Sequence, residues 1–98
     1  MLEINLKDTT AIDRFFFGPE SDQDLIQLTI YRAVKSAIEL DQDQAVVATI
    51  GLDSGEQMEL VCKRSEYVDK LTNCLTYFEQ IEAYETCADI LKLLTIRQ

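Results

Sequence analysis

The chain has 98 residues, of which 18 are acidic and 9 basic, so that its net charge is −9, and it contains no histidine. This length predicts one domain, residues 1–98, and 47% hydrophobic content is too high for a disordered acidic tail. The charge argues against direct nucleic-acid binding, because contacts to a phosphate backbone depend on clustered Lys and Arg.

The first segment is predicted to be a strand followed by a short helix. Apolar and polar residues alternate at the start, with the apolar ones at Leu2, Ile4 and Leu6. Thr10 and Asp13 then have the spacing of a capping box, with Asp in place of the usual Glu. We expect a helix over about 11–17 that stops at Gly18-Pro19, with Gly18 in the left-handed closing conformation.

A long amphipathic helix is predicted next. Ser21 and Asp24 repeat the capping signature, and the helix is expected to run to about Leu40. One side of it is apolar and includes two small residues; this side consists of Ile26, Ile30, Ala33, Val34, Ala37 and Ile38. The alanines allow another element to approach closely.

A β-hairpin is predicted in the middle of the chain. Its strands are 45–50 and 57–63, and the second alternates with Met58, Leu60 and Cys62 on one side. The turn 53–55 suits a last residue, Gly55, with positive φ. Because 45–50 is almost continuously apolar, that strand should be central in its sheet or covered on both faces.

The last third is predicted to be helical. Ser65 is expected to cap a helix that ends near Gln80 or Glu82, followed by a second helix after a break at 81–83; one continuous helix is the alternative. The expected apolar stripes are Val68, Leu71, Leu75 and Phe78 on the first helix and Tyr84, Cys87, Ala88, Leu91 and Leu94 on the second. The whole pattern predicts an α+β fold, in which a three-stranded sheet is covered by a long helix and a C-terminal helical hairpin.

Residues 80–94 resemble the second half of the UVR helical-hairpin motif of excinuclease subunits and Clp-related chaperone adaptors. The residues at matching steps are Tyr84, Glu85, Cys87, Ala88 and Ile90. Leu91 and Lys92 stand where that family has an Arg-Asp pair, so partner contacts made by the pair are in doubt. The resemblance covers about a sixth of the chain and implies a protein-docking hairpin without catalysis.

Two apolar clusters are candidate interaction surfaces. Phe15, Phe16 and Phe17 are consecutive, and successive helical residues point about 100° apart, so all three cannot enter one core stripe. They form either a plug covered on two sides or an interface anchor. The C-terminal apolar run is also wider than one helical stripe, which suggests a dimer or partner seam; it consists of Ile90, Leu91, Leu93, Leu94 and Ile96.

Acidic residues form a candidate binding ridge. On a continuous helix, Glu79, Glu82, Glu85 and Asp89 would follow one another along one side. Repulsion between them costs about 0.2–0.5 kcal/mol per pair, so helix formation does not explain them. The ridge is either a solvated face or a docking edge for a basic partner. Mimicry of DNA would further require a second acidic group on the same side, namely Asp13, Glu20, Asp22 and Asp24.

The sequence offers no signature of catalysis or of a metal site. Cys62, Cys74 and Cys87 are 12 and 13 residues apart, without the close pairs of a structural zinc site, and are expected to be buried free thiols. No histidine is present to activate a nucleophile. Asp41-Gln42-Asp43 begins like a calcium loop but lacks its central Gly and closing Glu. We therefore expect no metal, no cofactor and no enzymatic activity.

These observations favour a small acidic interaction protein. It would act as an adaptor, inhibitor or assembly factor with a protein partner, and a phage-encoded regulator is compatible with its size and charge. The surplus apolar surface also favours a homodimer over a monomer. The alternatives are a DNA or RNA mimic that occupies a basic groove, and an oligomer that binds a small molecule or cation between subunits. No apolar run reaches the length of a membrane span and no signal peptide is evident, so a cytoplasmic protein without membrane contact is expected.

Overall fold

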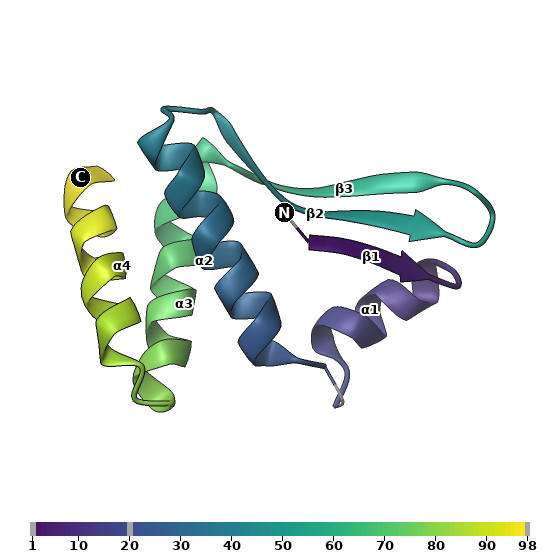
Figure 1. The fold of residues 1–98 in the computed structure, drawn as a ribbon, viewed down its shortest axis with the longest axis horizontal. Coiled ribbons are helices and arrows are strands. Elements are labelled where there is room, and N and C mark those ends of the chain that lie inside the picture. The colour runs from purple at the N-terminus through teal and green to yellow at the C-terminus, as the bar shows by residue number, and fades with distance from the viewer. Residues whose placement is uncertain (1, 20, 98) are drawn as a thin grey trace.

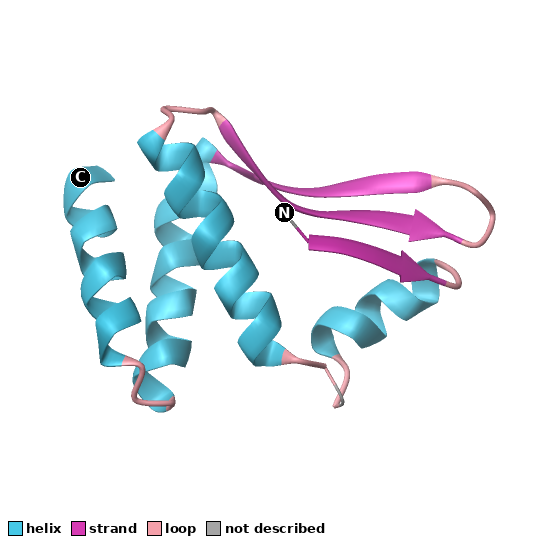
Figure 2. Ribbon diagram, viewed as in Figure 1, coloured by secondary structure: helices cyan, strands magenta, loops and turns pink. Residues whose placement is uncertain are grey.

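The computed structural model describes residues 2–19 and 21–97 and has the predicted α+β fold (Figure 2). Its elements are β1 (Leu2–Leu6), α1 (Thr9–Phe17), α2 (Gln23–Glu39), β2 (Gln44–Leu52), β3 (Gln57–Lys63), a 3₁₀ turn (Arg64–Glu66), α3 (Tyr67–Gln80) and α4 (Tyr84–Arg97). The fold class is therefore confirmed, and so is the division of the C-terminal third into two helices.

The sheet has the strand order β1-β2-β3. Strand β1 runs parallel to β2, and because a parallel pair needs a long crossover, α1 and α2 together make that connection. Strands β2 and β3 form the predicted antiparallel hairpin. Gly55 in its turn has a φ of 92°, which confirms the predicted left-handed position.

The central position of β2 accounts for its continuous apolar run. It pairs with β1 on one edge and with β3 on the other, as predicted. A register irregularity between Val46 and Ala48 places Val47 as an extra residue on β2. Because this bulge breaks the strict alternation, both Val47 and Ala48 are buried.

Only one face of the sheet is covered. The register aligns Ile4, Ile50 and Met58 across the three strands, and the first two of these are buried. We call this the inner face. On the outer face the aligned residues include Glu3 and Glu59, whose side chains are exposed. The sheet therefore depends on one layer of helices for its burial.

Helix α2 lies between the sheet and the C-terminal helices (Figure 1). It packs on β2 and on α3, and α4 packs mainly on α3. The core runs through all of these layers, and its side chains with at most 1% exposure are Val34, Ala37, Ala48, Tyr67, Leu71, Cys74 and Ile90. The predicted α2 stripe is confirmed, since its members are buried or half-buried.

The predicted helix caps are wrong in detail. Asp8, not Thr10, caps α1, because its Oδ1 accepts a hydrogen bond from the Ala11 amide at 3.1 Å. Asp22, not Ser21, caps α2 in the same way, through the Leu25 amide at 3.1 Å. A carboxylate has the advantage over a hydroxyl here, because the helix N-terminus favours negative charge.

Two further local predictions are corrected. Ser65 is not an N-cap but lies inside the 3₁₀ turn, where Glu66 Oε1 accepts from the Lys63 amide at 2.9 Å. Gly18 closes α1 with a φ of −71°, which is not left-handed. A Cβ atom at Gly18 would lie 2.5 Å from the Arg14 carbonyl oxygen, so close approach and not positive φ requires glycine there.

The break between α3 and α4 forms without glycine or proline. Glu82 takes the left-handed conformation, with a φ of 62°. The Ala83 amide then donates to the Phe78 carbonyl at 2.9 Å, which closes the end of α3. Residues 81–83 thus reverse the chain where the sequence predicted a break.

The buried sides of α3 and α4 differ from the predicted ones. Helix α3 buries Tyr67 and Cys74 beside Leu71 and Phe78, whereas Val68 is exposed. Helix α4 buries Cys87, Ile90 and Leu93, whereas Tyr84, Ala88 and Leu91 are exposed. The two helices are apolar over more of their circumference than one neighbour can cover, so packing selects one of two possible stripes.

The buried side of α3 can be tested by a pair of substitutions. Leu71→Ala should lower the free energy of unfolding by about 2–5 kcal/mol, because Leu71 is fully buried and its truncation leaves a cavity. Val68→Ala, one turn earlier, should change it by no more than about 0.5 kcal/mol. Urea unfolding followed by circular dichroism measures both, and equal losses would contradict the packing of α3.

Candidate functional site

The three phenylalanines of α1 have three different environments. Phe16 is buried, Phe15 is half-buried, and Phe17 is 83% exposed. The Phe15 and Phe16 rings meet edge to face with centroids 5.0 Å apart. The expectation that they cannot all enter one core stripe is confirmed, and Phe17 is left at the surface.

Phe16 and Phe17 border a groove of about 330 Å³ that we call the α1 groove. Its lining comes from four elements and is mostly apolar: Ile12, Phe16 and Phe17 of α1; Gln23, Ile26, Gln27 and Ile30 of α2; Leu60 of β3; and Lys70 and Asn73 of α3. The sheet extends past the three larger helices, and α1 lies under this extension (Figure 1). The groove forms where α1 and α2 diverge beneath the inner face.

Hydrogen bonds fix the junction between α1 and α2 at one end of this groove. Gln23 Nε2 donates to the Phe16 carbonyl and to Ser21 Oγ, each at 2.9 Å. These bonds hold the end of α1 and hence the position of Phe17, while the groove beside them stays open.

Gln27 supplies a polar group to the groove that lacks a partner. Its Oε1 atom is buried and accepts no hydrogen bond within residues 2–19 and 21–97. Such an atom loses the stabilisation that a donor would provide. Lys70 adds a positive charge to the same lining. The groove therefore offers apolar contacts and a cation to whatever binds there, whereas Gln27 Oε1 is buried and is not on the accessible surface.

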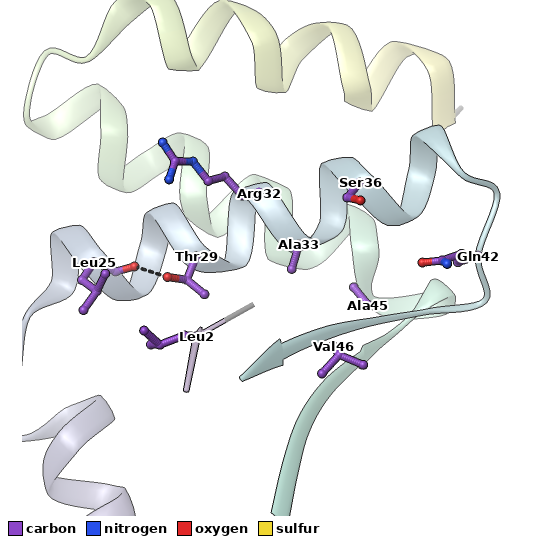
Figure 3. A pocket seen from close by; sticks show the side chains of 9 residues that line it. All are labelled: Leu2, Leu25, Thr29, Arg32, Ala33, Ser36, Gln42, Ala45 and Val46. Atoms are coloured by element: carbon purple, nitrogen blue, oxygen red, sulfur yellow. Dashed lines mark hydrogen bonds between the residues drawn. The ribbon is translucent and has the colours of Figure 1, made fainter. Parts of the chain in front are cut away.

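A second hollow, of about 440 Å³, lies between α2 and the starts of β1 and β2 (Figure 3). Its apolar lining consists of Leu2, Leu25, Ala33, Ala45 and Val46. Arg32 is at its rim, but the guanidinium group is directed away from the strands. Because its polar groups do not converge on one point, this hollow lacks the arrangement that orients a small ligand.

The predicted acidic ridge is not continuous. Glu79 lies on α3, Glu82 in the break, and Glu85 and Asp89 on α4. The ridge required one unbroken helix, and the chain reversal at 81–83 removes that premise. The four residues therefore do not follow one another along one side of a single helix.

Asp89 belongs to a cluster that joins α4 to α2. The Tyr31 hydroxyl donates to its carboxylate, and Lys35 Nζ lies 3.0 Å from Asp89 Oδ2. These two hydrogen bonds, that of Tyr31 first, hold the pKa of Asp89 below its ordinary value of 3.8. Burial, and then the bond to Asp89, raises the pKa of Tyr31. The Asp89 carboxylate is therefore paired within the protein, with Tyr31 and Lys35, and is not a free acidic group.

A second tyrosine and carboxylate pair brings two acidic segments together. Tyr77 of α3 donates to Asp24 of α2, so the start of α2 lies beside the end of α3. Asp22 and Glu79 are thereby placed at the same end of the helices. Asp13 lies on α1, and Glu20 is outside the described residues. Nothing in the sequence pattern predicted this pairing.

The C-terminal apolar run is divided between core and surface. Ile90 and Leu93 are buried, Leu94 is half-buried against the core, and Leu91 is 53% exposed. The side chain of Ile96 lies outside the described part of the structure. Among the predicted seam residues whose side chains the structure describes, only Leu91 is exposed enough to contact a partner.

The cysteines are buried and free, as predicted. Burial raises the pKa of all three thiols, that of Cys74 to about 11, so they are poor nucleophiles. In residues 2–19 and 21–97, no three Cys, Asp or Glu side chains gather as a metal site requires.

Sequence reasoning missed most of the groove lining outside α1. The sequence placed Leu60 on one side of its strand with Met58 and Cys62, but did not indicate that it would line a groove with α1. Gln27 and Lys70 were not among the predicted site residues. No local signal brings these three elements together.

Comparisons with protein-family models, with curated proteins and with solved structures found no match to this chain. The resemblance of 80–94 to the UVR motif stays a prediction. Within the described ranges, no helix is both long and apolar enough to cross a membrane.

The Asp89 cluster predicts a pH dependence of stability. Because the folded pKa of Asp89 is below 3.8, its contribution is complete above that value and is lost as the pH falls through the folded pKa. Wild-type protein should therefore be more stable than Asp89→Asn at neutral pH, and the difference should shrink as the pH falls below 3.8.

Urea unfolding at neutral and acidic pH measures this difference. Asp53→Asn, in the exposed hairpin turn, is the control because it makes the same change in charge away from α4. A difference between wild type and Asp89→Asn that is constant with pH would contradict the assigned role of the carboxylate.

Proposed function

We propose that this protein is a small, acidic, non-enzymatic docking protein whose α1 groove binds an apolar segment of another protein. It would serve as an adaptor, inhibitor or assembly factor. The observation that carries the proposal is Phe17, a large aromatic side chain 83% exposed at the border of an apolar groove. An exposed aromatic group beside an unfilled apolar groove is typical of an interface anchor.

The physical gain from filling the groove is considerable. A phenylalanine buries about 150–250 Å² when covered, and each Å² of apolar surface removed from water contributes about 25 cal/mol. The volume of about 330 Å³ is at the small end of ligand sites and suits a few side chains of a docked helix or strand. We therefore expect a short apolar segment, not a whole domain face.

The charged group of the groove indicates what the segment carries beside its apolar side chains. A carboxylate would pair with Lys70. An apolar segment with an acidic neighbour fits this lining.

The rest of the chain supports a binding role without catalysis. It has no histidine, and its three thiols are buried with raised pKa values. Three free cysteines also suit a reducing compartment, so we place the protein in the cytoplasm as part of this proposal.

The groove is tested with Phe17→Ser. The side chain contributes little to the core, so unfolding free energy should stay within about 0.5 kcal/mol of wild type. The amount of partner that the immobilised chain retains from its source cells should fall by about tenfold, as expected for loss of an anchor residue. Quantitative mass spectrometry of the retained proteins measures this fall.

Leu40→Ser is the matched control, because Leu40 is also an exposed apolar residue but lies at the other end of α2. It should retain the same proteins as wild type. If Phe17→Ser retains the same proteins in the same amounts, the α1 groove is not the docking site.

A further inference from the structure

The side of α4 that faces away from the protein carries a second apolar stripe. Tyr84, Ala88 and Leu91 are four and three residues apart, so they lie on one side of the helix, and all are exposed. Tyr84 is 66% and Leu91 53% exposed. We call these three residues the α4 outer stripe. Helix α4 forms one end of the molecule, so this side is open (Figure 1).

Two opposite charges lie along one edge of this stripe. At 100° per residue, Glu85 and Lys92 are both rotated by roughly 80–100° from Tyr84 in the same sense. They are seven residues apart, about two helical turns, and both are exposed. One edge of the stripe is thus negative near the start of α4 and positive further along it.

This arrangement is complementary to itself when two copies of α4 lie antiparallel. A two-fold axis perpendicular to the helices and centred near Ala88 places Tyr84 of each copy beside Leu91 of the other. The same axis keeps the charged edges on one side, so that Glu85 of each copy meets Lys92 of the other. In a parallel pair the two-fold axis would run along the helices and place the two charged edges on opposite sides of the contact, so Glu85 would not meet Lys92.

The small side chain at the centre allows the helices to approach. Ala88 lies at the crossing point, where a small residue lets the larger ones on either side interdigitate. With a net charge of −9 on each copy, overall repulsion opposes association. At physiological salt that repulsion is screened beyond about 8 Å, so close opposite pairs decide the outcome.

From this self-complementarity we infer that a second copy of this chain covers the α4 outer stripe, forming an antiparallel dimer with two Glu85–Lys92 pairs. The inference uses a different face from the α1 groove and does not depend on the proposed function. The dimer leaves α1 of each copy uncovered.

A charge-swap series tests the inference by sedimentation equilibrium at micromolar concentration and physiological salt. Wild type should have twice the monomer mass of 11.2 kDa. Glu85→Lys and Lys92→Glu should each raise the dissociation constant by about tenfold or more, because each creates two like-charge contacts. The double variant restores both pairs and should return to within about threefold of wild type.

Glu59→Lys is the matched control, since it makes the same charge change as Glu85→Lys on the outer face of the sheet. It should not weaken the dimer, and neither should Phe17→Ser. Urea unfolding of each variant verifies that the fold is kept.

Leu91→Ser tests the apolar part of the same contact. It changes no charge and should also weaken the dimer.

Four results would overturn the inference. These are a wild-type monomer throughout the micromolar range, single variants that leave the dissociation constant unchanged, a double variant that does not recover, and a dimer that Phe17→Ser or Glu59→Lys weakens as much as the α4 variants do.

Discussion

Helix α2 is buried on two sides, and this double burial joins the two halves of the molecule. Toward the strands, Ala33 lies opposite Ala45, and small residues let helix and sheet approach (Figure 3). Toward α3, the Tyr31 and Phe78 rings meet edge to face with centroids 6.3 Å apart. A three-stranded sheet with one open face is marginal alone, and neither α3 nor α4 contacts the strands as extensively as α2 does. The layers therefore hold together only while α2 fits between them.

The far end of the sheet is covered much less well. Helix α1 has nine residues and buries one of them, Phe16. Besides the α1 groove, a further hollow of about 480 Å³, distinct from that of Figure 3, lies beside α1 and is lined in part by Leu6 and Phe15. A short helix with so few buried contacts docks weakly, so this end is expected to open more easily than the layers around α2. A binding surface commonly lies in such a region, because a partner can complete the packing.

The two proposed surfaces lie in different parts of the molecule (Figure 1). The α1 groove lies between α1 and the neighbouring sides of α2 and α3, and the α4 outer stripe is at the end of the helical layers. A dimer through α4 would therefore leave both α1 grooves uncovered. Such a dimer could hold two partner segments at once, which strengthens attachment to a partner that repeats its binding segment.

The sequence by itself determined the order and type of the elements. Apolar periods of two and of three to four, the turn at Gly55, and Gly18-Pro19 depend on backbone geometry within a few residues, so they identified the strands, the hairpin and the helices. They also indicated that Phe15, Phe16 and Phe17 cannot all enter one core stripe. The sequence did not identify the N-cap residues of α1 and α2, because Asp8 and Asp22 stand close to hydroxyl residues with similar capping ability.

Only the tertiary structure decided which side of each C-terminal helix is buried. On α4, the stripe of Cys87 and Ile90 and the stripe of Tyr84 and Leu91 are both apolar at helical spacing, and the choice between them depends on where α3 lies. The α1 groove likewise brings together residues far apart in sequence, from Ile12 to Asn73. Local patterns determine where helices and strands form, because they act over one or two turns. The side on which a broadly apolar helix is buried depends instead on long-range packing.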